Sequence, residues 1–98
     1  MDKQDIIARL KENEGALRAR GVMHAALFGS RARGDSRDDS DIDIMIEIAP
    51  EAPVDLFAYV AITQYLADMF PIRVDIANRS KLKTPIRPSA EQEAIYAF

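Results

Sequence analysis

The sequence predicts an α/β domain built on a small mixed sheet with helices packed on one face. Two segments, residues 41–48 and 72–76, alternate apolar and polar side chains, as half-buried strands do. A third apolar run, Val22–Phe28, lies between two glycines. Segments of helical length precede and separate these runs. This order of elements is the pattern of an α/β fold.

The first element, residues 2–20, is expected to be one helix. Its apolar residues recur at helical spacing, with acids in the first turn and arginines in the last. Gly21 follows as a suitable helix end. Asn13 and Gly15 weaken the middle of this helix, because both residue types have low helix propensity.

Two strands are expected to follow the first helix. Val22–Phe28 leads into a Gly-Ser turn, and residues 30–33 can form one short helical turn. The rest of the link to the next strand, residues 34–39, is polar. The second strand, 41–48, then alternates cleanly and ends at a segment with two prolines.

The remaining elements are a helix at 55–70, a strand at 72–76 and a last helix at 89–98. The helix at 55–70 is apolar on both faces, so its outer face is either a partner surface or a cover for the sheet edge. Its length suits a crossover that makes the strands on either side parallel. Residues 81–88 contain two prolines and are expected to be irregular, and a capping-box pattern then opens the last helix.

Composition limits the classes of function. A chain of 98 residues is expected to be a single domain over 1–98, with any large substrate bound elsewhere. It has no cysteine and one histidine, so a metal would sit on oxygen ligands. Its net charge of -3 argues against direct nucleic-acid binding. The polar start and the lack of a long apolar run predict a cytoplasmic protein with no membrane contact.

Three aspartates are the candidate catalytic and metal-binding residues. Asp41 and Asp43 flank one apolar residue, so a strand would point both to the same face. Asp75 is expected opposite the core face of the third strand and would join them. Like charges held together favour a bound cation, and carboxylate oxygens suit Mg²⁺. Two such ions could clamp the attacking and leaving oxygens of a phosphoryl transfer.

The turn before these aspartates is the candidate phosphate site. Gly29 allows a phosphate to approach the backbone, and Ser30 offers a hydroxyl and an amide at the start of a helical turn. Arg31, Arg33 and Arg37 could neutralise triphosphate charge, and Arg33 is preferred over Arg37 as a ligand because it lies nearer the turn. Interleaved acids indicate that some of these arginines only form surface pairs. Glu47, further along the aspartate face, is interpreted as a solvated acid.

These residues resemble the hallmark of the DNA polymerase beta nucleotidyltransferase superfamily: Gly-Ser, ten residues, Asp-x-Asp, then a later strand aspartate. Residues 28–34 and 40–44 are typical of its minimal nucleotidyltransferase (MNT) branch. The resemblance covers nearly the whole chain and implies the polymerase-beta-like fold. It assigns Gly29 and Ser30 to the triphosphate and Asp41, Asp43 and Asp75 to the metal ions.

The resemblance also implies an activity and a partner. The activity is transfer of AMP from ATP with Mg²⁺, releasing pyrophosphate, and the expected acceptor is a tyrosine of a HEPN-domain toxin that this chain would neutralise as antitoxin. An alternative is a binding module that blocks its partner by forming a complex, without chemistry. An antibiotic nucleotidyltransferase is a third possibility, which the lack of a helical second domain disfavours.

Overall fold

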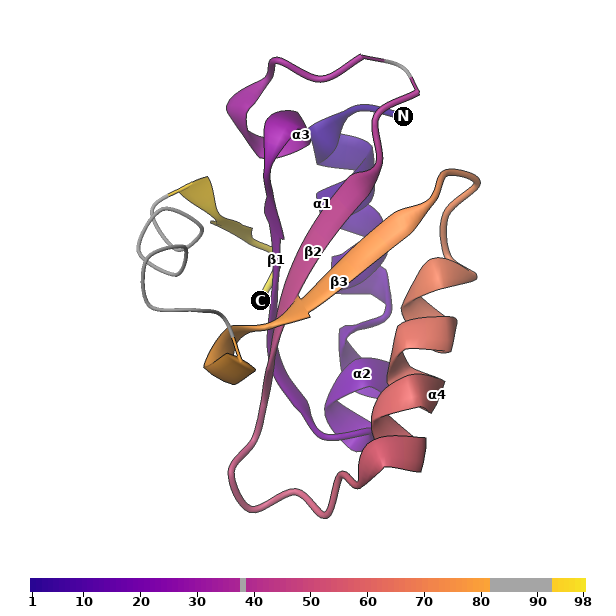
Figure 1. Ribbon diagram of the computed structural model, residues 1–98, viewed down its shortest axis with the longest axis vertical. Helices are drawn as coiled ribbons and strands as arrows, with labels where there is room; N and C mark the ends of the chain where they lie inside the picture. Colours follow the sequence, from indigo (N-terminus) through magenta and orange to yellow (C-terminus); the bar gives the residue numbers. More distant parts are fainter. Residues whose placement is uncertain (38, 82–92) are drawn as a thin grey trace.

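The computed structural model describes residues 1–37, 39–81 and 93–98, and its centre is a four-stranded sheet (Figure 1). The strands are β1 (Val22–Phe28), β2 (Ile42–Ile48), β3 (Val74–Asn78) and β4 (Ile95–Tyr96), in the order β3-β2-β1-β4. β2 is antiparallel to β1 and parallel to β3. The parallel pairing predicted from the sequence is therefore confirmed, and the sheet is mixed.

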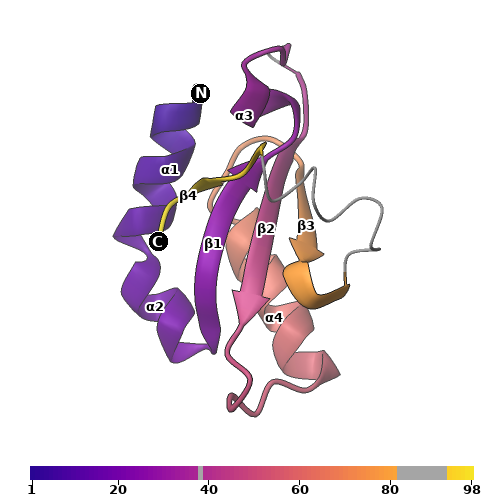
Figure 2. The same cartoon turned by 90° about the vertical axis from the view of Figure 1, so that its left-hand side faces the viewer.

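Three helices cover one face of the sheet (Figures 1 and 2). They are α1 (Lys3–Glu12), α2 (Glu14–Ala19) and α4 (Leu56–Ala67), while α3 (Ser30–Arg33) is a short turn at the end of β1. The helices and the facing side chains of the strands form one buried cluster. The largest fully buried members are Ile6, Leu10, Leu17, Val22, Leu27, Ile42, Ile44, Ile46, Ile62 and Leu66. This arrangement confirms the predicted fold class.

The N-terminal segment is two helices, so the prediction of one helix over 2–20 is wrong. The break is at Asn13, whose backbone N–H bonds to Leu10 and Lys11 carbonyls in a tightened turn. The Asn13 side chain donates to the Arg9 carbonyl at 2.8 Å and accepts from the Tyr65 hydroxyl at 2.8 Å. Asparagine competes with the backbone for hydrogen bonds, and here a contact with α4 also fixes the break.

The C-terminal residues form a strand, so the prediction that the last helix continues through Ile95 and Tyr96 is wrong. Tyr96 pairs with Ala26, and the N–H of Ala97 donates to the Ala25 carbonyl at 2.8 Å. These bonds pair the outer edge of β1 at residues 25–27 and bury Ala97, which outweighs a local helix signal. The start of that predicted helix, and most of the predicted irregular link, lie outside the described residues.

The outer face of α4 is apolar and exposed, as its composition indicated. Leu56 is 72% exposed, Phe57 84% and Val60 50%. Leu56 and Tyr59 also line an adjacent groove of about 590 Å³ beside β2 and β3. Within the described ranges, no helix has the length and apolar character needed to cross a membrane.

Candidate active site

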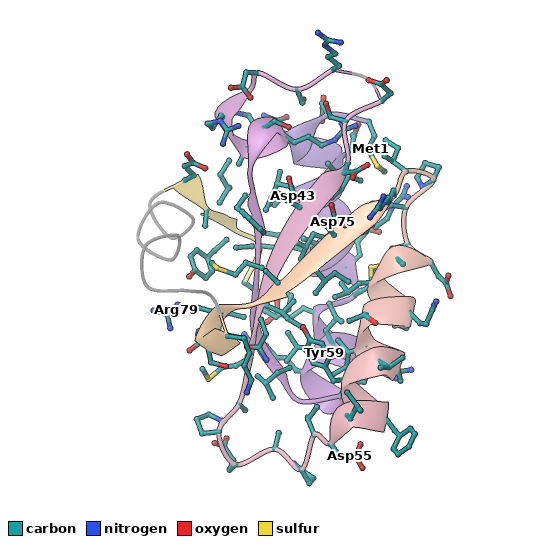
Figure 3. All side chains as sticks on the ribbon, viewed as in Figure 1. Met1, Asp43, Asp55, Tyr59, Asp75 and Arg79 are labelled. Atoms are coloured by element: carbon teal, nitrogen blue, oxygen red, sulfur yellow. The ribbon has the colours of Figure 1, made fainter. Side chains whose placement is uncertain are left out.

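Asp43 and Asp75 lie side by side on the sheet face opposite the helices (Figure 3). They are direct register partners in the parallel pair of β2 and β3. Asp41 precedes β2 by one residue and shares the Asp43 face because side chains alternate along an extended chain. Around these residues the face is open, since the Asp75 side chain is 50% and the Asp41 side chain 41% exposed. Further along it is closed, because Ala26 and Met45 are buried.

Gly29 brings the Gly-Ser turn against Asp43. Phe28, the residue before it, is the register partner of Asp43 on β1. Gly29 has φ 75° and ψ −155°, a conformation almost confined to glycine. A Cβ on Gly29 would collide with Asp43 Oδ2 and lie 3.1 Å from its Cγ. The turn therefore needs glycine for two reasons, its backbone angles and the space taken by the Asp43 carboxylate.

The pKa of Asp43 is raised above the ordinary aspartate value. Burial is the largest cause, followed by the negative charges of Asp75 and Asp41. Arg33 partly offsets them by favouring the charged carboxylate. The three aspartates therefore share one electrostatic environment, with Asp43 at its centre.

Arg73 is a site residue that the sequence interpretation missed. Its Nε lies 3.8 Å from Asp41 Oδ2, and its Nη2 lies 3.5 Å from Asp75 Oδ1. One guanidinium therefore contacts two of the three carboxylates. Alternation could have found it, because Arg73 stands two residues before Asp75 and so shares its face.

Arg33 lies near the carboxylates but already has partners. Its Nε contacts Asp35 at 3.2 Å and its Nη1 contacts Glu93 at 3.0 Å. Hydrogen bonds to these two carboxylates raise the pKa of Arg33 further, so it stays charged. Ser30 is the first residue of α3, where early backbone N–H groups lack a carbonyl one turn before them.

Two other candidates, Arg31 and Glu47, have partners outside the three aspartates. Arg31 is buried and structural: it donates to the Ser40 carbonyl at 2.6 Å and to the Met1 carbonyl at 3.1 Å. Glu47 was interpreted as a solvated acid, but it pairs with Arg79 at 3.1 Å, with both side chains largely covered. In the described part of the chain, no three acidic or histidine side chains form a ready cluster around one ion.

Comparison with known proteins gives consistent results. A family model for the nucleotidyltransferase domain matches residues 5–97. The protein adenylyltransferase MntA of Thermococcus cleftensis is 33% identical over 94 residues, covering 95% of this chain and 93% of that protein.

Two solved structures share the fold. One, provisionally assigned as a minimal nucleotidyltransferase, has a TM-score of 0.79 at 28% identity, covering 97% of this chain and 95% of that one. The other is the complex of a tri-AMPylated Shewanella oneidensis HEPN toxin with its MNT antitoxin, with a TM-score of 0.63 at 19% identity, covering 94% and 71%. At that identity the second likeness supports the fold alone.

The mixed sheet, its covered face and the aspartate pair beside a glycine turn define a polymerase-beta-like nucleotidyltransferase. The family model and the relative from Thermococcus cleftensis identify the family more narrowly. The chain belongs to the nucleotidyltransferase domain family, in its minimal nucleotidyltransferase branch.

Proposed function

We propose that residues 1–98 are one minimal nucleotidyltransferase domain that moves AMP from ATP to a tyrosine hydroxyl of a HEPN toxin in the cytoplasm. The chain would act as the antitoxin of that pair. The register pairing of Asp43 with Asp75, beside Gly29 on an open face, is the observation that carries the proposal. The relative named MntA is a protein adenylyltransferase, and the AMPylated HEPN toxin complex contains an antitoxin of the same fold.

The carboxylates fit a divalent cation. Burial raises the pKa of Asp43 most, and the negative charges of Asp75 and Asp41 raise it further by a repulsion that a cation would turn into attraction. Asp41, Asp43 and Asp75 would hold Mg²⁺, with two ions as the expected number, through the oxygen ligands that it prefers. Bound there, Mg²⁺ would supply charge neutralisation for the phosphates and the acceptor oxygen.

The chain's own residues would position the donor. In the reaction the acceptor oxygen bonds to the α-phosphorus of ATP, the bond from that phosphorus to the bridging oxygen breaks, and pyrophosphate leaves. The hydroxyl proton passes to solvent or to a nearby carboxylate. The Gly29 backbone would lie close to the triphosphate, Ser30 would offer hydrogen-bond donors, and Arg33 would balance phosphate charge at the edge of the site.

The test is transfer of label from ATP labelled at the α-phosphate to the partner toxin in the presence of Mg²⁺. Asp41→Asn and Asp43→Asn should each lose transfer by at least 100-fold, on the order of what a lost catalytic contact costs. Glu12→Gln is the matched control, because Glu12 is an exposed acid in a helix on the opposite face of the sheet. Full transfer by Asp43→Asn would refute the proposal.

The second candidate is neutralisation by binding alone, which the exposed apolar residues of α4 favour. Toxin inhibition by the two aspartate variants, measured with ATP and Mg²⁺ present, separates the candidates. If both variants inhibit the toxin as well as the wild type does, and no label is transferred, binding is the function.

A further inference from the structure

Arg73 places a positive charge beside two of the three carboxylates of the site, those of Asp41 and Asp75. Its guanidinium reaches Asp41 Oδ2 at 3.8 Å and Asp75 Oδ1 at 3.5 Å. A backbone hydrogen bond of 2.9 Å, from the N–H of Ile42 to the Arg73 carbonyl, holds the two chain segments together at this point. The contact therefore follows from the β2/β3 register, because the residues before the two strands are fixed beside each other.

The contact is easily displaced. The Arg73 side chain is 77% exposed, and both separations are longer than that of a tight charge-assisted hydrogen bond. Exposed ion pairs of this kind contribute little to stability. A divalent cation, with twice the charge and a preference for carboxylate oxygen, competes well for the same oxygens.

We propose that Arg73 is a built-in counter-ion of the aspartates, which a divalent cation must displace. Arg73 then stabilises the metal-free site and weakens metal binding, so that the site loads only when the cation, or its complex with a nucleotide, is abundant. This inference rests on the proposed function, because it takes the aspartates as metal ligands. It concerns metal affinity and not the chemical step.

The test is Mn²⁺ binding to the full chain, measured by calorimetry without nucleotide at about 0.1 M salt, where charges are screened over about 10 Å. Arg73→Gln should lower the Kd on the order of tenfold, the range open to the loss of two exposed ion pairs. Arg73→Lys, which keeps the charge but not the forked guanidinium, should have a Kd between those of Arg73→Gln and the wild type. In EDTA the Arg73→Gln variant should unfold at a lower temperature than the wild type. Mn²⁺ should raise the Tm of this variant by more than it raises the Tm of the wild type.

Arg79→Gln is the matched control. Arg79 pairs with Glu47 at the other end of β3, six residues or roughly 20 Å from Arg73, well beyond the screening distance of salt. Figure 3 shows Arg79 apart from Asp43 and Asp75. Its loss removes the same charge from the chain, so its Kd should stay within twofold of the wild type.

Three results would overturn the inference. An Arg73→Gln Kd within twofold of the wild type would show no competition, and a weaker Kd would show that Arg73 holds the aspartates ready for the metal. An equal gain in Mn²⁺ affinity in Arg79→Gln would show that the effect comes from the net charge of the chain. Separately, Mn²⁺ binding that Asp43→Asn leaves unchanged would refute the metal site of the proposed function, and the inference with it.

Discussion

Gly29→Ala tests the tight contact between the Gly-Ser turn and the aspartates. The substitution forces alanine into a conformation almost confined to glycine, which costs about 1–3 kcal/mol. It also drives a Cβ into the Asp43 carboxylate, and overpacking of this kind costs about 1–3 kcal/mol. The free energy of unfolding should therefore fall by about 2–6 kcal/mol, and Asp43 should be pushed from its place.

Two other glycines separate these costs in urea denaturation. Gly34 has φ 84° with nothing within 4 Å of an added Cβ, so Gly34→Ala reports backbone strain alone. Gly15 lies in α2 with open space around it, so Gly15→Ala should be neutral or should stabilise by up to about 1 kcal/mol. The expected order of destabilisation is Gly29→Ala, then Gly34→Ala, then Gly15→Ala.

A double-mutant cycle isolates the collision. Asp43→Ala removes the carboxylate, so Gly29→Ala should cost about 1 kcal/mol less in that background than in the wild type. The reasoning is refuted if Gly29→Ala costs no more than Gly34→Ala, or if the cycle shows no coupling between positions 29 and 43.

Three further predictions concern pH, an arginine pair and the core. Because the Asp43 pKa is raised in the folded protein, the stabilisation that Asp43 gives the metal-free protein is present below pH 3.8 and declines as the pH rises through the folded pKa. Denaturation in EDTA should show this decline in the wild type and a weaker one in Asp43→Asn. Arg31→Ala should lower the free energy of unfolding by about 2–4 kcal/mol, because two backbone carbonyls lose a buried partner. Arg33→Ala should cost under about 1 kcal/mol but weaken ATP binding in a fluorescence titration, and equal costs would contradict the structural role of Arg31. Leu66→Ala, in the core, should cost about 2–5 kcal/mol and Phe57→Ala, on the surface, under about 0.5 kcal/mol in the same assay, and a large Phe57 effect would mean that α4 is covered in the isolated chain.

Much of the fold could be predicted because the strands carry a strong period. Ile42, Ile44 and Ile46 mark the covered face of β2, and that alternation places Asp43 on the other face. The helix between two such strands then predicts their parallel pairing. The sequence placed the third strand at 72–76, two residues before the observed Val74–Asn78, because strand ends depend on pairing with a neighbour.

What could not be predicted depends on contacts between distant segments. The break at Asn13 is fixed by Tyr65, 52 residues away, and β4 exists because β1 has an edge to pair. In the site, alternation gives the face of Asp75 but not its register against Asp43. The partners of Arg33 and Arg73 likewise come from separate segments of the chain.

The order of the strands leaves β3 at one edge of the sheet and β4 at the other. β4 has only two residues, and β3 is flanked by charged Arg73 and Arg79 and carries Asp75. Short or charged edges discourage the addition of a foreign strand. The charges proposed to act at the metal site would thus also protect the sheet from aggregation, so variants that neutralise Arg73 or Asp75 should be screened for self-association before any loss of activity is interpreted.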